Sequence, residues 1–154
     1  MKRISIILSF SGLIFTFAHE AHHPKTLEIP KQEKKLQKIN EAYIEQVKPI
    51  FQSKCFDCHS SSTKYPWYYS LPMIRRKIDE DIAEAKKHLD FNHNFPFQGH
   101  GSPEEDLKAI AEVIQKGSMP PFRYRILHWN SRLTTSEKEK IMLWVLNSER
   151  LLLQ

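Results

Sequence analysis

One pentapeptide, Cys55-Phe56-Asp57-Cys58-His59, limits what this chain can fold into more than any other feature, because it holds both of the chain's cysteines. Two thiols at this spacing lie on the same side of a helical turn. Each can attach to one vinyl group of a single porphyrin, and the histidine that follows can ligate the iron at the centre of the ring. The motif therefore predicts one covalently attached haem c, held by Cys55 and Cys58, with His59 as the proximal axial ligand.

Other sites use the same pair of cysteines, and each predicts a companion feature. A structural zinc site has four ligands, but the chain has no second cysteine pair. A thioredoxin-like dithiol follows a strand in a βαβ unit, whereas the flanks of this motif show helical periodicity. A plain disulfide between Cys55 and Cys58 remains as the alternative to haem attachment.

The N-terminus has the pattern of an export signal. Lys2 and Arg3 precede an apolar run from Ile4 to Ala18 that is too short for an ordinary membrane span. Thr16 and Ala18 are small residues at the positions that a signal peptidase reads. We expect residues 1–18 to be a signal peptide, cleaved after Ala18, that exports the chain to the bacterial periplasm. An uncleaved membrane anchor is the alternative.

Composition argues against nucleic-acid and membrane partners for the mature chain. The net charge is +5, and it falls to about +3 once Lys2 and Arg3 are removed, which is too small to indicate a nucleic acid. With 27% charged residues, we expect no stable membrane insertion after signal cleavage. Residues 19–31 contain two prolines and no apolar period, which predicts a flexible tether. Residues 32–154 have the length of one domain.

The domain reads as all-α, because apolar residues recur every three or four positions and no convincing strand appears. The first predicted helix starts at Gln32 and leads into the cysteine motif, with a kink or break at Pro49. The second opens with Pro72 in its first turn. Its apolar face is predicted to consist of Ile74, Ile78, Ile82, Ala85 and Leu89.

Capping signals define two further helices. Ser102 and Glu105 form a capping box, and Gly117 is suited to end the helix that follows. Thr134 and Glu137 form the capping box of a final helix. Between the second and third helices, residues 90–101 are rich in Phe, Asn, Pro and Gly and predict a long loop over the core.

Four aromatic residues follow the cysteine motif within a short stretch, namely Tyr65, Trp67, Tyr68 and Tyr69. Such side chains can clamp the edge of a porphyrin or donate a hydrogen bond to one of its propionates. They can equally pack in an ordinary core. The sequence favours neither of these interpretations over the other.

The second axial ligand decides the function, and Met119 is the leading candidate. It follows the third predicted helix, and Pro120 and Pro121 restrict the backbone that carries it, so its sulfur could be held against iron. A methionine in a loop can also simply fill the core. Met73 and four histidines compete for the role, of which His128 is the strongest: His88, His93, His100 and His128.

The order of these elements resembles that of a class I cytochrome c. From Ile39 to Leu151, the chain resembles more closely the bacterial haem-binding domain family. The matching residues are Cys55–Ser60, Thr63, Tyr65–Tyr68, His88–Asn92, Ile114, Gly117, Met119–Pro120, Tyr124, His128, Leu133–Thr134, Glu137, Ile141 and Trp144. The resemblance implies a cytochrome c-like helical domain wrapped around one covalent haem. It also implies that Cys55 and Cys58 carry the haem, with His59 and Met119 as the axial pair.

A His/Met-ligated iron has no open position for a substrate, which leaves single-electron transfer. We therefore expect an exported electron carrier between extracytoplasmic redox partner proteins. Its basic residues either orient an acidic partner or are merely solvated. One alternative is a haem peroxidase-like enzyme that uses His100 or His128 as distal acid or base. Another is a haem-based sensor in which Met119 exchanges for a ligand.

Overall fold

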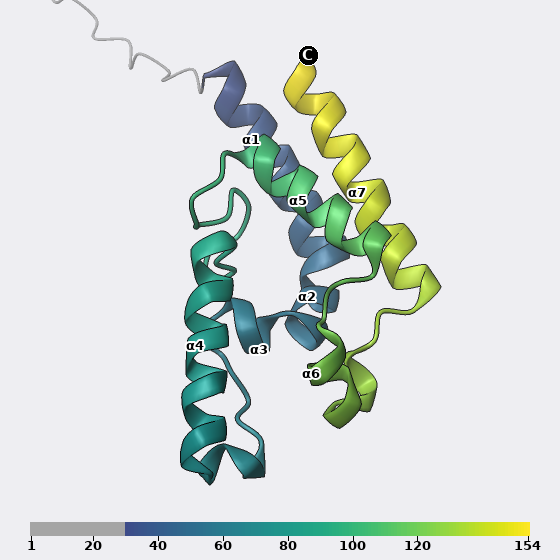
Figure 1. Cartoon of the computed structure of the whole chain (residues 1–154). Helices are drawn as coiled ribbons and strands as arrows, with labels where there is room; N and C mark the ends of the chain where they lie inside the picture. The colour runs from purple at the N-terminus through teal and green to yellow at the C-terminus, as the bar shows by residue number, and fades with distance from the viewer. Residues whose placement is uncertain (1–29) are drawn as a thin grey trace, which may run out of the picture.

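The computed structural model describes residues 30–154, so the predicted signal peptide and the tether up to residue 29 lie outside the described residues. The described part is all helical, as predicted, and contains no strand, only an isolated antiparallel bridge between Asp90 and Gln98. Figure 1 shows the arrangement of the longer helices, whose bounds are α1 Lys31–Ala42, α2 Lys48–Lys54, α3 Phe56–His59, α4 Pro72–His88, α5 Pro103–Lys116, α6 Phe122–Leu127 and α7 Thr135–Leu153. A π-helical turn, η1 (Tyr43–Val47), and two 3₁₀ turns, η2 (Trp67–Ser70) and η3 (Trp129–Ser131), complete the set.

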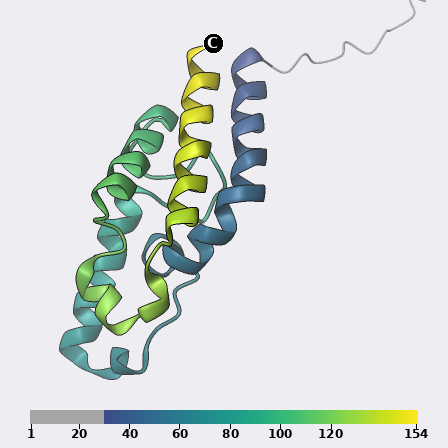
Figure 2. The same cartoon turned by 90° about the vertical axis from the view of Figure 1, so that its right-hand side faces the viewer.

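The break predicted at Pro49 is present, but it spreads over the preceding turn. The turn η1 is π-helical and separates α1 from α2, and Figure 2 shows the change of direction there. Proline lacks an N–H and its ring crowds the carbonyl four residues earlier, which widens the helix before it. The α2 segment then delivers Cys55 to the start of α3.

A core of aromatic side chains fills the space among α1, α2, α5 and α7. Tyr43, Phe51 and Trp144 contribute from the helices, and Phe91, Phe95 and Phe97 contribute from the loop after α4. The Tyr43 and Phe97 rings meet edge to face with centroids 5.0 Å apart. The indole N–H of Trp144 donates to the carbonyl oxygen of Ile39 at 3.2 Å, which joins α7 to α1. The prediction that residues 90–101 fold over the core is therefore confirmed.

Both predicted capping boxes are formed. The Ser102 hydroxyl accepts the Glu105 N–H at 3.3 Å and the Glu105 carboxylate accepts the Ser102 N–H at 2.8 Å. Thr134 and Glu137 make the same pair of bonds at the start of α7. Gly117 ends α5 with φ at 60°, a left-handed conformation that favours glycine. These end points fix the loop that carries Met119.

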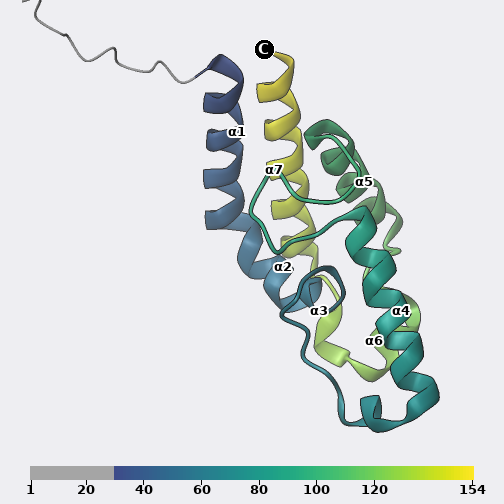
Figure 3. The same cartoon turned by 90° about the vertical axis from the view of Figure 1, so that its left-hand side faces the viewer.

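The helix α4 spans 17 residues and none of them is buried, whereas α1, α5 and α7 each bury part of one face. Its close backbone neighbours are α3 and η2, and Figures 1 and 3 show it running along the side of the lower part of the molecule. The apolar face that the sequence predicted lines a cavity. No helix among residues 30–154 combines the length and the apolar character that crossing a membrane would need.

Candidate functional site

A cavity of about 1100 Å³ opens beside α3 and brings the four predicted site residues together. Cys55, Cys58 and His59 reach it from the motif, and Met119 reaches it from the loop after α5. Its volume lies slightly above the usual range for ligand pockets, roughly 300–1,000 Å³. Apolar side chains make up much of its wall, including Ile74, Ile78, Ile82, Ile110, Val113 and Leu127.

The motif forms a single tight turn, which places both thiols on the cavity side. The N–H groups of Cys58 and His59 both donate to the Cys55 carbonyl oxygen, at 3.1 and 3.0 Å. Both cysteines are free thiols, so the alternative disulfide is not formed. Burial raises the pKa of Cys55 to about 12 and also raises the pKa of Cys58. The thiols are therefore neutral at pH 7, unlike the low-pKa cysteine of a redox dithiol.

The imidazole of His59 is held in one orientation. Its Nδ1–H donates to the Leu89 carbonyl oxygen at 2.8 Å, which leaves the Nε2 lone pair free. The ring of Phe91 packs beside it with centroids 5.2 Å apart. Burial lowers the pKa of His59, so the ring is neutral at pH 7. A backbone carbonyl holding the other nitrogen is the usual support of a metal-binding histidine.

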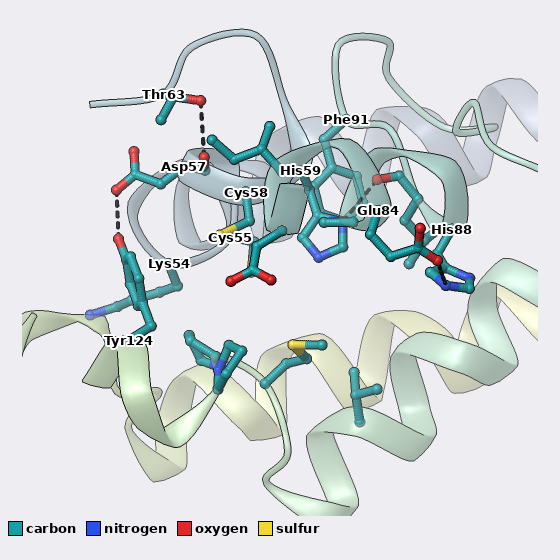
Figure 4. A pocket seen from close by; sticks show the side chains of 18 of the residues that line it. Lys54, Cys55, Asp57, Cys58, His59, Thr63, Glu84, His88, Phe91 and Tyr124 are labelled. Carbon is teal, nitrogen blue, oxygen red and sulfur yellow. Dashed lines mark hydrogen bonds and ion pairs between the residues drawn. The ribbon is translucent and has the colours of Figure 1, made fainter. Parts of the chain in front are cut away.

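Asp57, one of the two residues between the cysteines, ties the motif to α6, a contact that the sequence did not predict. The Tyr124 hydroxyl donates to Asp57 Oδ2 at 2.6 Å, and the Lys64 N–H donates to Asp57 Oδ1 at 3.0 Å. Figure 4 shows the Tyr124 bond at the cysteine end of the cavity. Burial raises the pKa of Tyr124, and the bond to Asp57 raises it further. Asp57 occupies one of the two positions of the motif where the residue type is not specified, so the motif gave no reason to expect this contact.

The histidines that compete with Met119 are engaged elsewhere or lie outside the cavity. His128 donates from Nδ1 to the Tyr124 carbonyl oxygen at 3.0 Å, and its Nε2 lies 3.5 Å from the Tyr68 hydroxyl. His88 and His100 line the cavity but pair with each other at 2.9 Å. His93 is not among the residues that line it. Met73 lines it from α4, with 81% of its surface exposed.

The four aromatic residues after the motif do not pack in the core. Only Tyr68 lines the cavity, while Trp67 is 85% exposed. Tyr65 and Tyr69 pack against each other outside the core, with ring centroids 4.1 Å apart. The prediction that these residues pack in the core is therefore wrong. Of the four, only Tyr68 lies where it could contact a porphyrin.

The donor set and the walls of this cavity fit a porphyrin. Two neutral thiols, one neutral imidazole and one thioether face a space that is otherwise largely apolar. No residue of α4 is buried, and a flat apolar ring would cover its apolar face. Residues 30–154 hold no cluster of three or more histidine, cysteine or acidic side chains able to bind a metal ion.

Comparison with known proteins also indicates haem binding. The chain is 31% identical over 93 residues to cytochrome c peroxidase Ccp of Escherichia coli strain K12. The match covers 59% of this chain and 20% of that protein, so the chain spans about a fifth of the length of this relative. No solved structure matches. The haem-binding domain family matches residues 10–147. Since that range includes the cavity and its four donors, the chain belongs to the haem-binding domain family.

Proposed function

We propose that this protein is an exported mono-haem c-type cytochrome that transfers single electrons between extracytoplasmic redox proteins. In this proposal Cys55 and Cys58 hold the haem through thioether bonds, and His59 and Met119 are the axial ligands. The observation that carries it is the meeting of two thiols, a fixed imidazole and a thioether on one apolar cavity. When bound, haem supplies one-electron exchange between ferric and ferrous iron.

The surroundings of each donor support its role. The thiols of Cys55 and Cys58 are neutral and half-buried, and a thioether would keep these positions uncharged. The imidazole of His59 presents Nε2 without competition from a proton, because Nδ1 carries the hydrogen that bonds to Leu89. Met119 sits in a segment whose ends are fixed by the Gly117 cap and by Pro120.

An electron carrier is favoured over a catalyst because His59 and Met119 would together ligate the iron of a bound haem and leave no open position for a substrate. The competing proposal is a haem peroxidase-like enzyme, and the similarity to cytochrome c peroxidase Ccp is the observation that favours it. That similarity covers a fifth of the relative's length, so it concerns one part of that protein and not the whole. A peroxidase-like site would also need a distal acid or base. His100 and His128 both line the cavity, but His100 is paired with His88, and His128 is held by Tyr124 and Tyr68.

Export to the periplasm belongs to the same proposal, since covalent haem attachment of this kind takes place outside the cytoplasm. It rests on Lys2, Arg3 and the short apolar run that ends at Ala18. Cell fractionation should place the mature protein in the periplasm with His19 at its N-terminus. Recovery of a membrane-bound species that begins with Met1 would contradict this.

Optical spectroscopy of the purified protein in both oxidation states tests the carrier against the enzyme. The ferric protein should show the weak near-infrared charge-transfer band of a His/Met haem, and Met119→Ala should abolish it. The same substitution should lower the reduction potential, because a thioether favours ferrous iron. His128→Ala is the matched control and should leave the band in place. Rapid binding of cyanide by the unmutated ferric protein would indicate an open site and favour the enzyme.

A further inference from the structure

A buried carboxyl group lies on the cavity face of α5 and has no role in holding a haem. Asp106 is 4% exposed and lines the cavity at the start of an otherwise apolar stripe that continues with Ile110, Val113 and Ile114. The hydrogen bonds of the first turn of α5 are made by Ser102 and Glu105, and the Asp106 carboxylate takes no part in them. Its Oδ1 lies against Gly101, where a Cβ would come within 2.5 Å of it.

A row of titratable side chains connects this carboxyl group to the surface. His100, from the loop before α5, directly precedes Gly101, against which the Asp106 carboxylate lies. Its Nε2 is 2.9 Å from Nδ1 of His88, and the Nε2 of His88 is 3.3 Å from the exposed carboxylate of Glu84. Figure 4 shows Glu84 and His88 meeting at the cavity wall on α4. Since imidazoles can both accept and donate protons, this row can carry a proton between solvent and Asp106.

The groups that face Asp106 act in opposite directions on its pKa. Burial raises the pKa of Asp106 to about 6, the negative charge of Glu105 on the same helix adds to the rise, and His100 opposes it. The N-terminus of α5 also favours the anion. An added negative charge in the same cavity would raise the pKa of Asp106 further, because charges interact more strongly where water is scarce.

We propose that Asp106 takes up a proton from solvent, by way of His100 and His88, when the haem in this cavity accepts an electron. This inference rests on the proposed function. The electron comes from a one-electron donor protein, and the proton comes from water or buffer. One O–H bond forms on the Asp106 carboxylate and no other bond changes, so the charge inside the cavity stays constant. The protein would then be a proton-coupled electron carrier.

The reduction potential of the haem-loaded protein, followed by spectroelectrochemistry from about pH 4.5 to about pH 8.5, tests this proposal. Coupling to one proton changes the reduction equilibrium up to tenfold per pH unit, which is about 59 mV for one electron. We expect the unmutated potential to be nearly level below about pH 6, where Asp106 is already protonated before reduction, and to fall with rising pH above it with a slope of up to this limit. Asp106→Asn should remove the slope. Glu104→Gln is the control, since it removes the same charge from an exposed position of the same turn.

A second measurement separates the acid from its route. In stopped-flow reduction with a pH indicator, the unmutated protein should take up close to one proton per electron. His100→Ala should slow that uptake several-fold while the equilibrium slope survives. A reduced-minus-oxidised infrared spectrum should contain a protonated carboxyl band that Asp106→Asn removes.

The outcomes distinguish this inference from the proposed function. A reversible one-electron couple whose potential does not depend on pH would overturn the role of Asp106 and leave the carrier intact. A slope that persists in Asp106→Asn would assign the proton to another group and also overturn it. A protein without any reversible couple would overturn the proposed function, and the inference with it.

Discussion

The two halves of this molecule differ in what packs against their apolar side chains. In the core half, formed by α1, α2, α5, α7 and the loop of residues 89–101, aromatic side chains pack on one another around Trp144, which is 2% exposed. In the cavity half, formed by α3, α4, α6 and the 3₁₀ turns, neither α4 nor α6 has a buried residue. The helix α5 serves both, with Leu107 in the core and Val113 on the cavity.

This difference shows that the apolar side chains of the cavity half face the cavity, whereas those of the core half pack on one another. Two polar bridges hold the cavity half in shape, namely Arg123 to Asp81 at 2.7 Å and Tyr124 to Asp57 at 2.6 Å. Neither bridge covers the apolar face of α4. A bound porphyrin would cover it, so we expect the cavity half to depend on haem and the core half to be largely independent of it.

The largest expected effect follows from preventing haem attachment. In the double variant Cys55→Ala and Cys58→Ala, purified without haem, the amide hydrogens of α4 should exchange almost as fast as those of an unfolded peptide. An isolated helix of this length is marginal in water without packing. Hydrogen exchange followed by mass spectrometry measures this, with α7 as the internal reference. Equal protection of α4 in the parent and the variant would contradict the division into two halves.

Truncating the centre of the core should affect the other half. Trp144→Ala should lower the free energy of unfolding by about 3–5 kcal/mol, because it removes a large buried ring and leaves a cavity. Urea unfolding measures the loss. Trp67→Ala is the matched control, since Trp67 is 85% exposed, and it should cost less than about 0.5 kcal/mol. Similar losses at the two tryptophans would show that the core half is not the stable one.

A smaller effect, opposite in sign, is expected at the boundary of the halves. The pKa of Asp106 is raised from 3.8 to about 6, so the folded protein binds this proton more tightly than the unfolded chain. Stability therefore falls as pH rises through this interval, and the whole cost is present at pH 7. Asp106→Asn should stabilise the haem-free protein by about 1–3 kcal/mol at pH 7 and by almost nothing below about pH 4.

Urea unfolding of that variant at the two pH values provides the test. Glu104→Gln removes a carboxylate from an exposed position of the same turn and should change stability by less than about 0.5 kcal/mol at either pH. A destabilised Asp106→Asn protein at pH 7 would mean that the carboxylate has a partner that stabilises it.

The smallest effect concerns the bridge between the motif and α6. Tyr124→Phe removes the hydrogen bond to Asp57 and should cost about 1 kcal/mol, because a half-exposed carboxylate recovers part of the loss from water. Thermal unfolding of the haem-loaded protein measures it. Tyr65→Phe should have no measurable effect, since Tyr65 is 52% exposed. A null result for Tyr124 would mean that this bridge contributes nothing to the shape of the cavity half.

Local signals predicted the parts of the fold that local chemistry controls. The Ser102 and Thr134 capping boxes and the Gly117 cap are formed, because these contacts join residues only a few positions apart. The loop of residues 90–101 covers the core as its phenylalanines predicted. The short helix α6 was not predicted, since six residues are too few to show a period.

The site was only partly predictable, because burial in it depends on which segments meet in space. An apolar face such as that of α4 looks the same in a sequence whether a protein core or a cavity lies beside it. The bond from Tyr124 to Asp57 joins residues 67 positions apart, and no spacing rule connects them. Asp106 is buried because the loop before α5 folds over it, and one sequence does not contain that information.

Intact-mass measurement of the exported protein under denaturing conditions tests the central claim most directly. If Cys55 and Cys58 hold haem in this cavity, the mass should equal that of the mature chain plus one haem. The Cys55→Ala and Cys58→Ala double variant, measured in the same way, should have the mass of the bare chain. A bare-chain mass for the unmutated protein, obtained from cells that load other c-type cytochromes, would contradict the account.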